Sequence, residues 1–264
     1  MKLKELLKEV LSEEELKIAP SSFDIIGNIA VIEIPKELEK KEKEIGEQLL
    51  KFKNIKTVLK KESKVENEFR LRKYKLIAGI DNKETIHVEY GCRFKLNLEK
   101  VYFSPRLASE RNRIVEQIKK EESVLVMFAG IGPYAIQIAK RSCAKEVYAI
   151  EINPEACRYM EENAKLNKVQ EKIKIFCGDV REIVPKLKEK FDRIVMPLPK
   201  GSENFLDLAK MVAKKDAIVH FYTFAPSEKE AIEKIDCKVR VLSCVRCGSY
   251  AKDLYRFCVD FIFI

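Results

Sequence analysis

Residues 124–132 read VLVMFAGIG, a short apolar run followed by a turn that contains Gly130 and Gly132. The run is bounded by a turn and predicts a buried strand. Glycine at the turn from a strand into a helix lets the backbone approach a ligand closely. A helix is expected next, over residues 134–141. This stretch therefore predicts the first strand-turn-helix unit of an α/β fold with a mostly parallel sheet.

The ends of the next two predicted strands carry polar groups suited to a nucleoside. Residues 147–154, VYAIEINP, place Glu151 21 residues after Gly130, where a carboxylate can accept from ribose hydroxyls. The third strand ends in Asp179 and Val180. The aspartate can accept from an adenine amino group, and the valine amide can donate to the ring. Three consecutive strand ends predict an adenosine cofactor at the switch point of a doubly wound sheet.

The residue after the glycine turn discriminates between adenosine cofactors. Pro133 stands at the helix start, and no third glycine follows the pair. A pyrophosphate would need free amides there, so a nucleotide-dependent dehydrogenase is disfavoured. S-adenosylmethionine has no phosphate and fits this turn better. A plain packing turn is the alternative reading of the glycines taken alone.

Hydrophobic periodicity predicts three parts: a short N-terminal helix (1–20), a small basic α/β module (21–104) and a larger α/β domain (105–264). Elements expected within them include a helical stripe over 3–18, a hairpin over 23–34 turning at Gly27-Asn28, a helix over 36–53, a strand over 93–103 and a helix over 183–189.

Composition excludes several classes of protein. The chain has 264 residues, a net charge of +9 and 46% hydrophobic residues, enough for a core and too many for intrinsic disorder. No apolar run approaches the ~18 residues of a membrane helix, and the charged start is no secretory signal. A cytoplasmic protein without membrane contact is expected. Residues 51–75 contain ten Lys or Arg and three Glu, either a solvated face or a surface for a polyanion such as nucleic acid.

The cysteines and histidines give weak signals. Cys244 and Cys247 have zinc-ligand spacing, but a structural site needs four ligands, and only Cys237 and Cys258 are nearby candidates. Buried thiols or a disulfide are favoured, and no metal is expected. Both histidines, at positions 87 and 220, are expected to be structural.

Four segments give the chain a family resemblance: EFRLRKYKLIAG, ETIHVEYGCRFKLNLEKVYFSPRLASERNRI, MFAGIGPYAI and FDRIVMPLPK. They resemble the archaeal and eukaryotic tRNA (guanine-37) N1-methyltransferases over about residues 20–264. The resemblance implies a Rossmann-like class I methyltransferase domain with a smaller N-terminal α/β RNA-binding module. It also implies S-adenosylmethionine as cofactor and the tRNA anticodon arm, at position 37, as partner. A monomer is expected.

The same matching implies roles for individual residues. Glu110 matches the family's general base, and Arg70 matches the arginine that stabilises guanine O6. Guanine N1 carries a proton, so methylation there requires a base near N1 and a cation near O6. The cofactor-binding residues implied are Tyr102, Arg111, Phe128, Gly130, Glu151, Ile152, Asp179, Val180 and Pro197, and the substrate-binding residues are Arg70, Pro197 and Pro199.

The chain departs from the family pattern at three places. Val126 stands where many members have an acidic residue. Residues 196–200 read MPLPK where many members have Asn-Leu-Pro, so Pro197 offers no side-chain polar group and no amide hydrogen. This Pro-Leu-Pro form resembles a subgroup that also methylates 4-demethylwyosine at the same tRNA position. Only about 20 residues precede the matching region, where members commonly carry a further tRNA-binding domain.

Two other functions compete with this interpretation. A sister family transfers the aminocarboxypropyl group of the same cofactor to a wyosine precursor. A non-catalytic RNA-binding protein with a relict methyltransferase fold is the second alternative, and intact Glu110 and Arg70 count against it.

Overall fold

The computed structural model describes residues 3–63 and 69–264, so residues 64–68 of the basic stretch lie outside the described part. It divides into two compact units: Met1–Glu89 with Arg93–Pro105, and Tyr90–Cys92 with Arg106–Ile264. Within the described residues, no helix is long and apolar enough to span a membrane.

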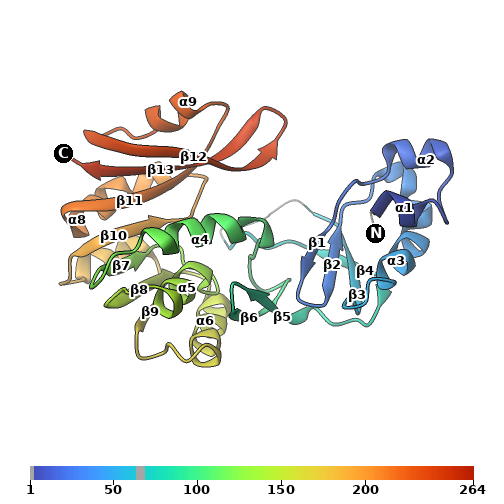
Figure 1. Ribbon diagram of the computed structural model, residues 1–264, viewed down its shortest axis with the longest axis horizontal. Helices are drawn as coiled ribbons and strands as arrows, with labels where there is room; N and C mark the ends of the chain where they lie inside the picture. Colours follow the sequence, from blue (N-terminus) through green and yellow to red (C-terminus); the bar gives the residue numbers. More distant parts are fainter. Residues whose placement is uncertain (1–2, 64–68) are drawn as a thin grey trace. The chain divides into compact units, whose positions relative to one another are not determined.

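The first unit contains a four-stranded sheet in the order β1-β2-β3-β4 (Figure 1). The predicted hairpin is confirmed, because β1 and β2 pair antiparallel around a turn in which Gly27 has a φ of +57°. β2 and β3 pair in parallel, and Leu3, Leu7 and Leu49 share the core beneath them. The elements are α1 (Leu3–Leu7), α2 (Glu13–Ile18), β1 (Asp24–Ile26), β2 (Ile29–Ile32), η1 (Lys36–Lys41), α3 (Glu42–Leu50), β3 (Thr57–Lys61), β4 (Tyr74–Gly79), and the two-stranded sheet of β5 (Glu84–Glu89) and β6 (Cys92–Asn97).

Three predicted elements of this part are shorter or broken. The stripe over 3–18 is two helices, because Ser12 begins α2 with a capping box in which its Oγ accepts from the Glu15 amide. The helix expected over 36–53 is a 3₁₀ helix followed by α3, which ends at Leu50. The strand expected over 93–103 ends at Asn97.

The second unit is a seven-stranded sheet in the order β12-β13-β11-β10-β7-β8-β9. Strands β7 to β11 pair in parallel, and β13 runs antiparallel to both β11 and β12. The order reverses at β7, which lies between β8 and β10. Crevices of doubly wound sheets open at the carboxyl ends of such strands. The predicted Rossmann-like α/β fold is confirmed.

Helices cover both faces of this sheet. In Figure 1, α4, α5 and α6 lie on one face. Buried residues of α7, α8 and α9 join the hydrophobic cluster on the other. The elements are η2 (Pro105–Leu107), α4 (Ala108–Gln117), β7 (Ser123–Val126), α5 (Pro133–Arg141), β8 (Glu146–Glu151), α6 (Pro154–Leu166), β9 (Ile173–Cys177), α7 (Val180–Ile183), η3 (Val184–Lys186), β10 (Phe191–Met196), η4 (Ser202–Phe205), α8 (Leu206–Val212), β11 (Ala213–Ala225), α9 (Glu228–Glu233), β12 (Val239–Ala251) and β13 (Leu254–Phe263).

The prediction of a helix over residues 183–189 is wrong. Asp179 caps an earlier, short helix, α7, by accepting from the Arg181 amide. Pro185 then lies in the 3₁₀ turn η3, since it cannot donate the amide hydrogen that a continuing α-helix needs. Helix α8 was not predicted from the sequence.

Candidate active site

The glycine turn after β7 leaves open space at the carboxyl edge of the sheet. Gly130 and Gly132 have φ values of +59° and +85°, which favour glycine. A Cβ on Gly132 would lie 2.8 Å from Met160 Cγ, so close packing against α6 requires this glycine. A Cβ on Gly130 would meet nothing within 4 Å, so this position has room for a ligand. Phe128 forms one side of the turn and packs edge-on against Phe205.

Glu151 ends β8 beside this open space. Its Oε2 accepts from the Gly130 amide at 2.6 Å, and its Oε1 accepts from the Asn153 amide at 2.8 Å. Burial raises the pKa of Glu151, while the backbone amides partly oppose this by stabilising the carboxylate. The two oxygens together offer about four acceptor sites, so the carboxylate keeps capacity to accept from a hydroxyl, which suits a ribose.

The end of β9 lies next to Glu151, because the Gly178 amide donates to the Glu151 carbonyl oxygen at 2.8 Å. Asp179 follows, and hydrogen bonds from Arg181 lower the pKa of its carboxyl. The three predicted strand ends are thus together at one sheet edge. Two other predicted cofactor residues lie at the same ends: Val180, which is buried, and Ile152, which is half-buried.

Replacing Glu151 with Gln should weaken S-adenosylmethionine binding about tenfold, because an amide nitrogen cannot accept from a ribose hydroxyl. Isothermal titration calorimetry measures the effect. Glu155→Gln is the matched control, since Glu155 lies on α6 and pairs with Arg158 near the surface. Equal affinities for wild type and Glu151→Gln would remove the assigned role.

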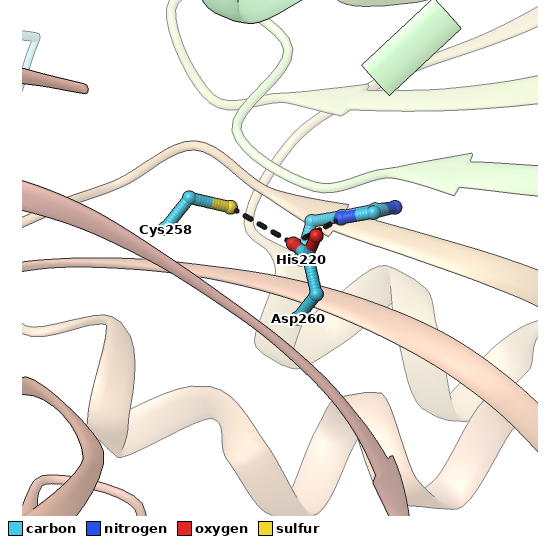
Figure 2. Close-up of side chains that lie close together, drawn as sticks. All are labelled: His220, Cys258 and Asp260. Carbon is cyan, nitrogen blue, oxygen red and sulfur yellow. Dashed lines mark hydrogen bonds and ion pairs between the residues drawn. The ribbon is translucent and has the colours of Figure 1, made fainter. Parts of the chain in front are cut away.

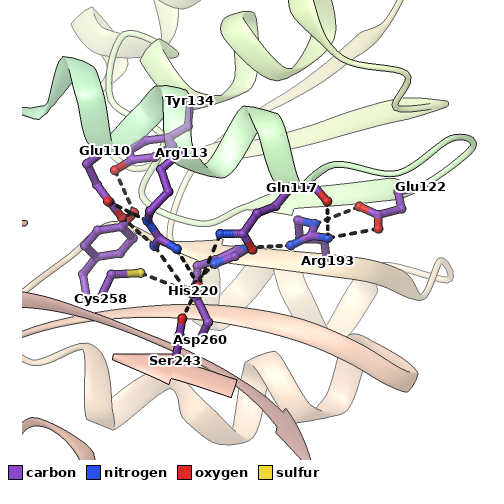
Figure 3. Close-up of polar contacts among 11 residues, drawn as sticks. Glu110, Arg113, Gln117, Glu122, Tyr134, Arg193, His220, Ser243, Cys258 and Asp260 are labelled. Atoms are coloured by element: carbon purple, nitrogen blue, oxygen red, sulfur yellow. Dashed lines mark hydrogen bonds and ion pairs between the residues drawn. The ribbon is translucent and has the colours of Figure 1, made fainter. Parts of the chain in front are cut away.

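A second polar group surrounds Glu110 on α4 (Figure 3). Glu110 is 5% exposed and receives two hydrogen bonds from Arg113, Nε to Oε2 and Nη2 to Oε1, both at 2.8 Å. The Tyr222 hydroxyl donates to Oε1 at 2.6 Å, and the Tyr134 hydroxyl donates to Tyr222 at 3.0 Å. Tyr134 follows Gly132 by two residues. A hydrogen-bonded series therefore connects Glu110 to the glycine turn.

Sequence reasoning missed the partners of Glu110. Arg113 had one signal, its spacing of three residues from Glu110 on a predicted helix. Tyr222 and Asp260 lie more than a hundred residues away along the chain. Nothing in the local sequence pattern pointed to them.

The remaining predicted residues lie at separate places. Arg70 and Tyr102 belong to the first unit, where the Arg70 guanidinium stacks 4.1 Å from the Tyr102 ring centroid. Arg70 has a φ of +58°, which is uncommon outside glycine. It is thus an ordered side chain rather than one more solvated cation. Arg111, beside Glu110 on α4, is 2% exposed.

The loop after β10 contains the two prolines of the predicted substrate wall. The Phe224 amide donates to the Pro199 carbonyl oxygen at 3.1 Å, which ties the loop to β11. The Leu198 amide donates to the Met196 carbonyl oxygen at 2.9 Å. Pro197 has no amide hydrogen to offer a ligand. This wall is consequently less polar than an asparagine would make it.

Within the described part of the chain, His220, Cys258 and Asp260 form a group that could hold a metal ion (Figure 2). Arg193 Nη1 lies 2.8 Å from His220 Nε2, and a guanidinium can only donate, so Nε2 accepts and Nδ1 keeps its proton toward Asp260. Arg113 also pairs with Asp260. Burial raises the pKa of the Cys258 thiol well above its usual range. Two guanidiniums and a protonated thiol make this a poor cation site.

The other zinc-spaced cysteines also carry protonated thiols. Burial raises the pKa of Cys244 to about 11 and that of Cys247 to about 12. The Cys247 thiol lies 3.6 Å from the Arg256 carbonyl oxygen. All eight cysteines are free thiols in the structure, and no disulfide joins Cys244 to Cys247.

Stability should fall on acidification because of His220 and Asp260. Burial lowers the pKa of His220. Burial opposes ionisation of Asp260, but hydrogen bonds from His220 and Arg113 outweigh it and hold the pKa of Asp260 far below its usual range. Both groups therefore bind protons more readily in the unfolded chain. Protonation of His220 therefore lowers the free energy of unfolding below about pH 6.5, and protonation of Asp260 lowers it further below about pH 4.

The expected slope below pH 6.5 is up to about 1.4 kcal/mol of unfolding free energy per pH unit for His220. Urea unfolding at pH 7.5, 6.5 and 5.5 measures it, and His220→Asn should flatten the dependence. A variant with the slope of the wild type would show that His220 is not the group responsible.

Family comparisons agree with this architecture. The TRM5/TYW2 methyltransferase domain matches residues 85–245, and the TYW2 N-terminal domain matches residues 3–83. The chain belongs to the TRM5/TYW2 methyltransferase family. The resemblance inferred from the sequence is thereby confirmed.

Several relatives of this TRM5/TYW2 family member are named for related activities. The tRNA (guanine(37)-N(1))-methyltransferase Trm5b of Pyrococcus abyssi is 44% identical over 94% of this chain and 77% of its own length. The tRNA (guanine(37)-N(1))/4-demethylwyosine(37)-methyltransferase Taw22 of Nanoarchaeum equitans is 35% identical, with 85% and 91% covered. The tRNA(Phe) (4-demethylwyosine(37)-C(7)) aminocarboxypropyltransferase of Pyrococcus horikoshii is 34% identical, with 86% and 80% covered.

Solved structures of the family also superpose on the chain. The complex structure of aTrm5 and tRNALeu has a TM-score of 0.90 and 35% identity, and covers 100% of this chain and 78% of that one.

Proposed function

We propose that this chain is a tRNA (guanine-37) N1-methyltransferase that uses S-adenosylmethionine. The observation that carries the proposal is the buried Glu110 carboxylate, linked through Tyr222 and Tyr134 to the glycine turn of the cofactor edge. Glu110 belongs to the same compact unit as Gly130, Glu151 and Asp179, which supports its assignment as the base. Family membership and the activity of the Pyrococcus abyssi relative support the same reaction.

The residues at the sheet edge fit the cofactor. Gly130 leaves room, Glu151 accepts from the ribose, and Asp179 with the Val180 amide binds the adenine. Bound S-adenosylmethionine supplies an electrophilic methyl group on a sulfonium. The further residues assigned to it are Tyr102 at the methionine end, Arg111, Phe128, Ile152 and Pro197.

The base and the cation act on different atoms of guanine. Glu110 takes the N1 proton, so that N1 becomes nucleophilic, and Arg70 stabilises the negative charge that grows on O6. Alignment of guanine N1 with the sulfonium methyl group supplies the remainder of the rate enhancement, since the displacement needs no other group. Pro197 and Pro199 line the wall against the base.

The partner proposed is the anticodon arm of tRNA, bound by a monomer in the cytoplasm. The basic residues around Arg70 supply cations for its phosphates. The complex of aTrm5 with tRNALeu supports tRNA as the partner class. Arg70 belongs to the first compact unit, which we propose binds RNA, and the residues of the cofactor edge belong to the second.

Product analysis tests this function. The chain is incubated with an unmodified tRNA transcript and S-adenosylmethionine labelled either in the methyl or in the aminocarboxypropyl group. Methyl label alone should enter the tRNA, in a nucleoside identified as 1-methylguanosine. A transcript with adenine at position 37 is the control and should remain unlabelled. Incorporation of neither label would overturn the proposal.

A second activity on 4-demethylwyosine is proposed for the same site. Pro197 makes the wall less polar and accommodates a larger tricyclic base, and the Nanoarchaeum equitans relative is a methyltransferase of both bases. tRNA that carries the precursor should acquire methyl label in the tricyclic base. Absence of label there would remove this activity.

Aminocarboxypropyl transfer is the competing function. Residues 3–83 match the TYW2 N-terminal domain, and the Pyrococcus horikoshii relative carries out that transfer. The same labelled cofactors decide, because only this reaction moves the aminocarboxypropyl label into precursor-containing tRNA.

A further inference from the structure

Glu110 is the first member of a buried series of charged and polar groups (Figure 3). Arg113 joins Glu110 to Asp260, with Nη1 donating to Asp260 Oδ2 at 2.6 Å. Asp260 accepts from His220 Nδ1 at 2.6 Å. His220 in turn accepts from Arg193, whose Nε donates to Glu122 at 2.8 Å. The series runs from α4 across β13, β11 and β10.

The two oxygens of Glu110 are not equivalent. Oε1 accepts from both Arg113 Nη2 and the Tyr222 hydroxyl, whereas Oε2 accepts from Arg113 Nε alone. A carboxylate oxygen has two lone pairs. Among the described residues, Oε2 is therefore the oxygen with acceptor capacity left for an incoming N–H.

Arg113 cannot turn away from Glu110 without losing other bonds. Its fork also binds both oxygens of Asp260, at 2.6 and 3.3 Å. Asp260 is itself fixed by Ser243, whose hydroxyl donates at 2.9 Å, and by His220. Bidentate guanidinium pairs are geometrically specific as well as strong. The fork thus transmits the rigidity of the sheet to the carboxylate on α4.

We propose that Arg113 and Tyr222 are positioning residues that aim Glu110 Oε2 at guanine N1, with Asp260 holding Arg113 in place. The inference rests on the proposed function and deepens it, because it assigns the proton to one oxygen and names the groups that aim it. Tyr222 does not touch the substrate. It fixes the rotation of the carboxylate by occupying Oε1.

The decisive pair of variants is Tyr222→Phe and Tyr148→Phe. Each removes one hydroxyl from a buried tyrosine that is hydrogen-bonded to another side chain, but Tyr148 accepts from Lys174 and only Tyr222 contacts Glu110. Single-turnover methylation of prebound tRNA measures the chemical step. Tyr222→Phe should reduce its rate constant about 10- to 100-fold, the scale of a misplaced catalytic group, and leave the Kd values for cofactor and tRNA unchanged. Tyr148→Phe should stay within about threefold of wild type.

A second pair tests the guanidinium fork. Arg113→Lys keeps the charge but loses the two-pronged contact, and should slow the chemical step about tenfold or more. Arg158→Lys is the matched control, because Arg158 makes comparable pairs with Glu155 and Glu162 at the surface of α6. Thermal unfolding of all four variants shows whether each remains folded.

The outcomes separate the two levels of the proposal. If wild type methylates guanine and Tyr222→Phe reacts as fast as Tyr148→Phe, the positioning role is overturned while the function stands. Equal losses in both tyrosine variants, accompanied by weaker cofactor binding, would also overturn it, since they indicate structural damage. If wild type transfers no methyl group, the proposed function fails first.

Discussion

Replacing Glu110 with Gln should reduce the single-turnover rate of guanine methylation by about 10²- to 10⁴-fold, the usual contribution of a general base. Glutamine has nearly the same shape but cannot take the N1 proton. Arg113 would keep its contacts with Asp260, so the fold should survive the change. Binding of S-adenosylmethionine should be unchanged, because Glu151 and Asp179 are untouched.

The matched control is Glu116→Gln, six residues further along α4. Glu116 is exposed, and among the residues that the structure describes it accepts a single surface hydrogen bond, from Asn112. This variant should methylate at the rate of wild type. Full activity in Glu110→Gln would show that another group, or water, takes the proton.

Removing the guanidinium of Arg70 gives the second-largest expected effect. Arg70→Ala should slow methylation about 10²- to 10³-fold, because charge develops on O6 as the N1 proton leaves and one donor to such a charge is typically worth that much. The Tyr102 ring, 4.1 Å from the guanidinium, holds it in one orientation. Arg70→Lys should recover only part of the rate, since an ammonium lacks the planar fork.

Arg72→Ala is the control for lost positive charge. Arg72 lies two residues further on in the same basic stretch and pairs with Glu33 at 3.6 Å. Both variants lose one cation that could contact phosphates, so their tRNA affinities should fall to a similar, small extent. A chemical step slowed equally in the two would contradict the O6 role and leave Arg70 as a phosphate contact.

Local pattern predicted the cofactor edge well, for a physical reason. The carboxyl ends of neighbouring parallel strands meet at one edge, so Gly130, Glu151 and Asp179 could be placed together from strand order alone. The confirmed hairpin at Gly27 depends on turn chemistry of the same local kind.

The helices whose bounds were predicted wrongly depend on single residues that cap or break a helix. Ser12 interrupts a continuous apolar stripe because its side chain offers the backbone another hydrogen bond. Pro185 stops a helix that charge and hydrophobicity alone would continue. Periodicity averages over such residues and cannot detect them.

The surroundings of Glu110 could not be predicted at all. Tyr222, on β11, contacts Glu110 from 112 residues along the chain, and Asp260, on β13, contacts Arg113 from 147 residues along the chain. Contacts of this separation are fixed by sheet topology and not by local sequence. His220 was expected to be structural, and its tautomer followed only from the position of Arg193.

The most direct measurement is the structure of the full chain with tRNA and S-adenosylhomocysteine bound. The proposed function predicts that the purine at position 37 is turned out of its stack, with N1 within about 3.2 Å of Glu110 Oε2 and O6 within hydrogen-bond reach of Arg70. A purine bound away from Glu110, with that carboxylate still hydrogen-bonded to Arg113 and Tyr222, would contradict it.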